Sequence, residues 1–263
     1  MSFSQCLPST ICWALSALSY DEDKVQTYIM ELFPSFRTHF WSYDRGAQFH
    51  GVVIDERESR IFHVHRGTDG FDKVGNLRSW LTDLRVFTGD NGIHNGFQWY
   101  GNRAFDEAKK YLEDYNEIFI TGHSQGSGVG QYDCCLCIEN LTLRHVEANL
   151  FAAPPCFNQT GADRFNAHLR SGLLSCNRFV NPNDPIAASW LRDQKHLVLN
   201  GCDAGKEIVL PDITLFDLGP VEFLNHSCAQ YNASYGLWLA QGLQHKHIYD
   251  YLLLGKIAKW LVN

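Results

Sequence analysis

Apolar residues follow first helical and then strand-like spacing along the first part of this chain. Side chains with helical spacing occupy Thr10–Leu18 and Val25–Phe33, and the proline after the second segment would end a helix there. Two short apolar runs come next, at Phe49–Ile54 and Arg60–His65, and the polar residues 55–59 separate them. This pattern predicts two helices followed by two strands that a polar turn connects.

The rest of the chain alternates strand-like runs with amphipathic helical stripes. The helical stripes lie at 97–112, 161–169 and 248–261, and the strand-like runs at 117–121, 148–152, 177–180, 196–199 and 207–210. Strands that alternate with helices usually form a mainly parallel sheet with helices on both faces. We therefore predict an α/β fold. Because the sequence shows no repeats, low-complexity segments or linkers, residues 1–263 are predicted to form a single domain.

One strand-like run leads directly into Gly-His-Ser-Gln-Gly at 122–126. Gly-x-Ser-x-Gly between a buried strand and a helix is typical of a nucleophile elbow, a strained turn that carries a reactive serine. Gly122 and Gly126 suit such a turn, because a side chain at either position would collide with a neighbouring strand or helix. The backbone N–H of Gln125 opens the helix and directs positive charge at Ser124. Ser124 is therefore the predicted nucleophile.

A serine in such a turn needs a histidine base, and the base needs a carboxylate that orients it. On folds with this elbow, the carboxylate follows the serine in the chain and the histidine comes last. We favour Asp184, which follows a strand-like run and lies in a proline-flanked turn at the carboxyl edge of the predicted sheet. Other aspartates downstream do not follow a strong buried strand: Asp203, Asp212 and Asp217.

Four histidines after Asp184 are candidates for the base. His196 begins a strand-like run and is interpreted as structural, whereas His226 lies in a loop that enters a helix. His245 and His247 lie close to the C-terminal helix, where a position facing solvent is common. We therefore prefer His226 and keep His247 as the alternative base.

Composition and charge narrow the class of protein. The chain has 263 residues, of which 45% are hydrophobic, and this is enough for one large core. Its formal net charge of −7 argues against a nucleic-acid partner. The spacing of Cys134, Cys135 and Cys137 is not that of a zinc site. His63 and His65 alternate on one strand and are interpreted as core or surface residues, so we predict no metal site and no cofactor.

The N-terminal residues lack the basic segment and the apolar run of a signal peptide. No segment approaches the roughly 20 consecutive apolar residues that a transmembrane helix needs. The sequence therefore predicts a cytoplasmic protein without a transmembrane segment, or a secreted one whose signal has been removed.

Six separated segments, in the same order, resemble those of the lipase class 3 family, the fungal triacylglycerol lipase type. His65–Thr68 is similar to the family's Phe-Arg-Gly-Ser/Thr, Trp80–Leu84 to its Trp-x-x-Asp, and Ile93–Phe97 to its Val-His-x-Gly-Phe. The remaining three resemble the Gly-His-Ser-Leu-Gly elbow, the segment with the catalytic aspartate, and His-Ser-x-x-x-Tyr, and they lie at 122–126, 181–186 and 226–231. No single segment would suffice, but together they cover nearly the whole chain.

The resemblance implies an α/β-hydrolase fold and a role for each matching residue. Ser124 would be the nucleophile, His226 the base and Asp184 its orienting partner. The backbone N–H groups of Gln125 and Thr68 would form the oxyanion hole, with the Thr68 hydroxyl as a further donor; such donors are worth roughly 3 kcal/mol each. The family usually has Leu at the position of Gln125, so a polar side chain lies beside the nucleophile here.

The segment 69–84 corresponds to the family's lid. Its apolar residues recur at helical spacing, with Leu77 and Trp80 as those expected to turn toward the site. A lid of this kind would cover the site in water and expose an apolar patch for transient contact with a lipid interface. The alternative is an amphipathic helix packed permanently on the core.

The predicted function is a serine carboxylic-ester hydrolase that forms an acyl-enzyme. Acylglycerols are the first expected substrates, followed by phospholipids and soluble short esters. The alternative is a catalytically silent hydrolase-fold protein that serves as a binding or signalling module.

Overall fold

The computed structural model describes residues 3, 5–43, 48–68, 91–142, 145–184, 187, 205–211, 227–242 and 248–262. The described helices are α1 Pro8–Leu18, α2 Val25–Leu32, α4 Asn95–Leu112, α5 Gln125–Asn140, α6 Gln159–Arg170, α8 Cys228–Gly242 and α9 Ile248–Val262. The described strands are β1 Phe36–Tyr43, β2 Gln48–Asp55, β3 Arg60–His65, β4 Glu117–His123, β5 His145–Phe151, β6 Leu174–Val180 and β7 Lys206–Val209.

The strands form a mixed sheet in which neighbours in the chain are also neighbours in space, in the order β1-β2-β3-β4-β5-β6-β7. Strand β2 runs antiparallel to both β1 and β3, and every neighbouring pair from β3–β4 to β6–β7 is parallel. Because parallel strands end at the same edge, the residues that follow β3, β4 and β6 come together at the carboxyl edge of the sheet.

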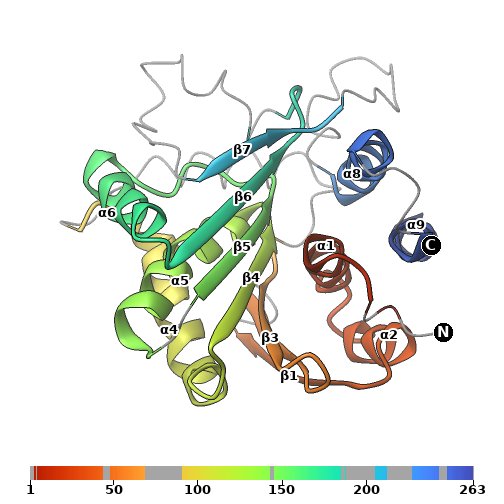
Figure 1. The fold of residues 1–263 in the computed structure, drawn as a ribbon, viewed down its shortest axis with the longest axis horizontal. Coiled ribbons are helices and arrows are strands. Elements are labelled where there is room, and N and C mark those ends of the chain that lie inside the picture. The colour runs from red at the N-terminus through yellow and green to blue at the C-terminus, as the bar shows by residue number, and fades with distance from the viewer. Residues whose placement is uncertain are drawn as a thin grey trace.

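Helices cover both faces of the sheet, as the sequence predicts (Figure 1). Helices α4, α5 and α6 lie on one face, and α1, α2, α8 and α9 lie on the other. Helix α4 shows why: Phe97, Tyr100, Ala104 and Ala108 recur every three or four residues and are all buried against the sheet. The mostly parallel α/β architecture is therefore confirmed.

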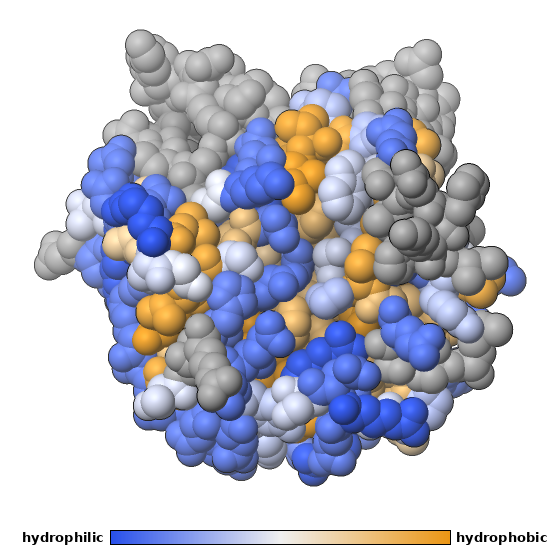
Figure 2. Space-filling view, in the orientation of Figure 1, coloured by the Kyte–Doolittle hydropathy of each residue, from blue (hydrophilic) through white to orange (hydrophobic). Residues whose placement is uncertain are grey.

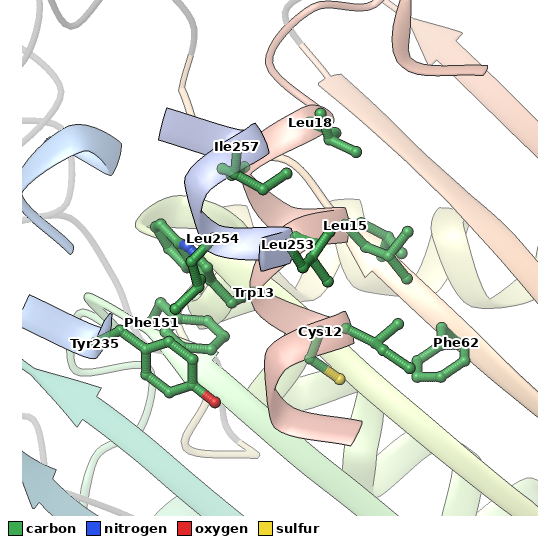
Figure 3. Close-up of a cluster of buried hydrophobic side chains, with 14 of the residues drawn as sticks. Cys12, Trp13, Leu15, Leu18, Phe62, Phe151, Tyr235, Leu253, Leu254 and Ile257 are labelled. Atoms are coloured by element: carbon green, nitrogen blue, oxygen red, sulfur yellow. The ribbon is translucent and has the colours of Figure 1, made fainter. Parts of the chain in front are cut away.

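The core on the α1 side joins segments from both ends of the chain (Figure 3). Trp13 of α1 packs on Phe151 of β5, with ring centroids 4.8 Å apart, and Leu254 of α9 lies beside it. The indole Nε1 of Trp13 also donates to the side chain of Asn232 in α8 at 2.8 Å. This layer therefore fixes α8 and α9 relative to the strands that end at the carboxyl edge.

Most of the predicted elements agree with the structure to within a few residues. The exceptions are β1, which the sequence pattern did not predict, and α8, which it gave only as the helix after a loop. Strand β1 is an edge strand with mostly half-exposed residues, so it lacks a continuous apolar run. The predicted run at 196–199 lies outside the described residues.

Polar residues cover most of the described part of the face in Figure 2, and apolar residues appear there in separate areas. No helix among the described residues combines the length and the hydrophobicity that a bilayer-spanning segment needs.

Candidate active site

Ser124 lies in a sharp turn between β4 and α5. Its backbone has φ 57° and ψ −125°, a left-handed conformation that a non-glycine residue adopts only under strain. A Cβ at Gly122 would stand 2.5 Å from the backbone of Gly126, and one at Gly126 would stand 2.1 Å from the carbonyl oxygen of His65. Both glycines are therefore required by close backbone contacts, as expected for a nucleophile elbow.

Hydrogen bonds to β5 hold this turn in place. The Ser124 amide donates to the Phe151 carbonyl at 3.0 Å. The hydroxyl oxygen of Ser127 accepts the Phe151 amide at 3.0 Å and lies 2.5 Å from the Gly122 carbonyl oxygen. Ser127 thus links the first turn of α5 to both β4 and β5.

The residues that follow β3 lie directly against the elbow. A Cβ at Gly67 would stand 2.6 Å from the His123 carbonyl oxygen and 3.1 Å from the Ser124 Cβ. The next residue, Thr68, donates from its hydroxyl to the Gln125 carboxamide oxygen at 3.0 Å. The structure therefore brings Thr68 and Gln125, the two predicted oxyanion donors, into contact beside Ser124. Their role in catalysis stays a prediction.

Asp184 lies in the turn after β6, at the same edge of the sheet, and is fully buried. One carboxylate oxygen accepts the Ala187 amide at 3.2 Å, and the other accepts the Tyr231 hydroxyl at 2.7 Å. That hydroxyl in turn accepts the Asn181 amide at 3.1 Å. Burial, and then the Asp184 carboxylate, raise the pKa of Tyr231 well above its usual range, so the phenol keeps its proton and donates it.

His123 precedes the serine and is enclosed by aromatic side chains. Its Nδ1 lies 2.8 Å from the Tyr20 hydroxyl, and its ring contacts those of Trp13 and Tyr231 edge to face. Tyr231 therefore contacts the residue before the nucleophile as well as Asp184. This environment fits the structural role expected for His123.

Several predicted site residues lie outside the described residues. They are the base His226, its alternative His247, and the lid segment 69–84 with Leu77 and Trp80. Helix α8 begins just after His226 in the chain, and the Ser227 hydroxyl accepts the Gln230 amide at 3.2 Å in its first turn. The assignments of base and lid stay predictions.

Two groups of described side chains have the chemistry of metal ligands. His63, His65 and Asp133 form one, and Cys135, Glu139 and His168 form the other. The Glu139 carboxylate already pairs with Arg164 and with His168, and burial raises the pKa of Cys135 to about 12, which keeps its thiol protonated.

The sequence did not reveal the contact between Tyr231 and Asp184. Tyr231 was noted only as the last residue of a family motif, and nothing in the local pattern indicates that its hydroxyl reaches the turn after β6. The alternation His63-x-His65 on a strand was a visible signal for the histidine group, since alternate strand residues share a face.

A mostly parallel sheet, a strained serine at the end of β4 and a buried aspartate after β6 are typical of a serine hydrolase with the α/β-hydrolase fold. The family model for lipase (class 3) matches residues 62–193, about half of the chain. The chain therefore belongs to the lipase class 3 family and is a lipid ester hydrolase.

Solved structures of fungal lipases are similar in fold. Lipase II from Rhizopus niveus has a TM-score of 0.58 at 17% identity, over 75% of this chain and 78% of its own. The triacylglyceride lipase of Rhizomucor miehei has a TM-score of 0.56 at 19% identity, over 78% of this chain and 79% of its own. A triacylglycerol lipase from Penicillium expansum has a TM-score of 0.52 at 16% identity, over 75% of each chain. No curated protein matches the sequence.

Proposed function

We propose that Ser124 attacks the carbonyl carbon of an acylglycerol ester, with His226 as the base and Asp184 as its orienting carboxylate. The elbow geometry of Ser124 is the observation that carries the proposal, because this strain is retained where a serine must face a substrate. His226 takes the serine proton and returns it to the alcohol leaving group. Water then attacks the acyl-enzyme and releases the fatty acid.

The contacts of α8 and α9 support His226 over His247. Tyr231, a few positions after His226, donates to Asp184 from the first turn of α8. Helix α9, which follows His247, instead uses Asp250 in its first turn to accept the Leu7 amide at 3.0 Å. The helix that follows His226 therefore contacts the Asp184 carboxylate through Tyr231. The helix that follows His247 instead contacts the residue before α1.

The backbone N–H groups of Thr68 and Gln125 would stabilise the oxyanion that forms when Ser124 attacks. The contact between their side chains supports this role, because it holds the two segments together beside the nucleophile. Neutral acylglycerols are the proposed substrates, in line with the triacylglycerol lipases of similar fold. The cytoplasmic location predicted from the sequence stays a prediction.

The test of the triad uses p-nitrophenyl esters of several chain lengths. Ser124→Ala is expected to lower kcat by more than about 1000-fold with an unchanged melting temperature. His226→Ala should lose activity to a similar extent and His247→Ala should not. Retention of most activity in Ser124→Ala would contradict the assignment. An inert wild type that a phosphonate ester fails to label would point to the silent binding module.

The lid at 69–84 is part of the proposal. Ser124 is fully buried, as expected for a nucleophile that is shielded from solvent when the enzyme is in aqueous solution. Opening at a lipid interface would then expose the site. The measurement is the rate of tributyrin hydrolysis as its concentration passes the solubility limit. A jump at emulsion formation supports a moving lid, whereas a smooth hyperbola indicates an ordinary esterase.

A further inference from the structure

A buried cluster of imidazole and carboxylate groups lies between β2, β3 and α5. His50 comes from β2, His63 and His65 from β3, and Asp133 from α5, and all four side chains are fully buried. His63 and His65 share a face of the sheet because they are two positions apart on one strand. His50 pairs with His65 in register on the neighbouring strand. None of these residues belongs to the proposed triad.

Three of these side chains present ligand atoms to a common point. One ring nitrogen of His63, one of His65 and a carboxylate oxygen of Asp133 all lie within 4.8 Å of one another. The Asp133 Oδ2 atom is 2.7 Å from His63 Nδ1 and 3.1 Å from His65 Nε2. Two ligands of one zinc ion, each about 2.0–2.1 Å from it, stand roughly 2.9–3.4 Å apart. The observed spacing is close to that range.

A chain of contacts favours one tautomer of His63, with the proton on Nε2. Nε2 of His50 lies 3.3 Å from the Glu107 carboxylate and 3.4 Å from the Tyr43 hydroxyl. A proton on that nitrogen satisfies the carboxylate and leaves Nδ1 of His50 as an acceptor. Nε2 of His63, 3.3 Å from that atom, then carries the proton of its own ring. Nδ1 of His63 is left with a lone pair facing Asp133.

Two lone pairs facing each other across 2.7 Å require a cation between them. Nδ1 of His63 makes no hydrogen bond of acceptable geometry to Asp133 despite this short distance. Metal-bound histidines characteristically donate their other ring nitrogen to a carboxylate or another acceptor, which fixes their orientation. The relay from His63 through His50 to Glu107 supplies such an arrangement.

The charge states of the cluster suit a metal ion. Burial, and then the neighbouring His63, lower the pKa of His65 to about 4, and burial with the same neighbour lowers that of His50 to about 2. Burial alone would raise the pKa of Asp133, but the adjacent His63 and His65 outweigh it and hold the pKa below its usual range. A neutral His65 imidazole and an ionised Asp133 carboxylate are the forms in which these two side chains bind a metal.

We propose that His63, His65 and Asp133 bind a divalent transition-metal ion such as zinc. Two nitrogens and one carboxylate oxygen form a donor set that suits zinc. The ion joins the end of β3 to α5. Strand β3 leads to Thr68, and α5 starts at Gln125, so the ion holds the two sides of the proposed oxyanion hole together without touching the substrate.

The test measures metal content and does not depend on catalysis. The full-length chain is produced in defined medium with added zinc or cobalt, because ligands this deeply buried are loaded as the chain folds. Wild type is expected to contain about one metal ion per chain. The cobalt form should show visible absorption bands from bound Co²⁺. Zinc should raise the unfolding midpoint by roughly 5–10 °C relative to chain produced with a chelator.

Variants locate the site. Asp133→Leu and His65→Gln should lose the metal and the cobalt spectrum. His168→Ala, in the group around Glu139, is the matched control and should keep both. Ser124→Ala should also keep both while losing esterase activity, which separates this proposal from the proposed function.

Two results would overturn the proposal. One is a wild-type chain without bound zinc or cobalt bands, and this needs no variant to fold. The other is a folded Asp133→Leu chain with the metal content of wild type. In either case the cation between His63 and Asp133 would be a proton, and the cluster a buried ion pair.

Discussion

Removal of one oxygen atom from Tyr231 tests how firmly the structure holds Asp184. In Tyr231→Phe the ring stays in its buried position, but the Asp184 carboxylate loses a donor at 2.7 Å and the Asn181 amide loses an acceptor at 3.1 Å. A hydrogen bond to a charged group contributes about 1.5–3 kcal/mol, and one between neutral groups about 1 kcal/mol. Together they predict a loss of roughly 2.5–4 kcal/mol in the free energy of unfolding.

Tyr235→Phe provides a matched control. Tyr235 lies one turn further along α8 and is also fully buried. Among the described residues, its hydroxyl forms hydrogen bonds only with the neutral hydroxyls of Ser9 and Thr10, at 2.9 and 3.3 Å. This variant removes the same atom from the same helix without touching Asp184. Tyr235→Phe should lower the free energy of unfolding by about 0.5–1.5 kcal/mol and leave kcat unchanged.

Urea unfolding and the hydrolysis of a p-nitrophenyl ester are measured for both variants. For Tyr231→Phe we expect the larger stability loss together with a fall in kcat of about tenfold, because a loosened Asp184 no longer orients the base. Equal stability losses would refute the inference that the Asp184 bond is the strong one. A large stability loss with unchanged kcat would instead remove Asp184 from the triad.

Three further outcomes are expected. Gly126→Ala should destabilise the chain by more than about 3 kcal/mol, because the new Cβ would stand 2.1 Å from the His65 carbonyl oxygen. Gly255→Ala is the control: its Cβ would have no described atom within 4 Å, so in the same melting experiment it should stabilise α9 slightly. Gln125→Leu should keep kcat/KM for p-nitrophenyl esters within about tenfold of wild type, since only its backbone N–H serves the oxyanion. In the metal-free chain the pKa values of His50 and His65 are near 6.5 when unfolded and about 2 and about 4 when folded, so the stability they contribute is complete above pH 6.5 and is lost as pH falls toward those lower values. Each of the two histidines should lower the free energy of unfolding by up to about 1.4 kcal/mol per pH unit as the pH falls. A free energy of unfolding that stays constant between pH 7 and 5 in urea titrations would contradict this.

The sequence predicted those parts of the fold whose signal is local. Strand β4, its glycines and α5 were found because a buried apolar run and Gly-x-Ser-x-Gly lie within a few positions of each other. Helix α8 gave a weak pattern because it buries polar side chains, among them Gln230, Asn232 and Ser234. Such residues are hydrogen-bonded in the interior, so a reading of hydrophobic spacing cannot distinguish them from surface positions.

The site was predicted only as far as single motifs reach. Ser124 and Asp184 each follow a strand and could be placed at the carboxyl edge from the chain order alone. The bond from Tyr231 to Asp184 and the contact of Trp13 with Asn232 join segments far apart in the chain, so only the folded structure shows them. The same is true of Asp133, whose position on α5 gives no hint of the histidines on β3.

The consecutive order of the strands has a consequence for biosynthesis. Each strand pairs with the one made just before it, so the sheet can grow at one edge as the chain leaves the ribosome. Helix α1 is made before the strands of the sheet, yet its apolar face packs on α9, which is made after them. The Leu7 amide likewise has no acceptor at Asp250 until α9 has been synthesised. Until α9 is made, the apolar side chains around Trp13 stay exposed and can associate with other chains. A nascent chain should therefore need a chaperone to protect the apolar face of α1 until α9 has been synthesised.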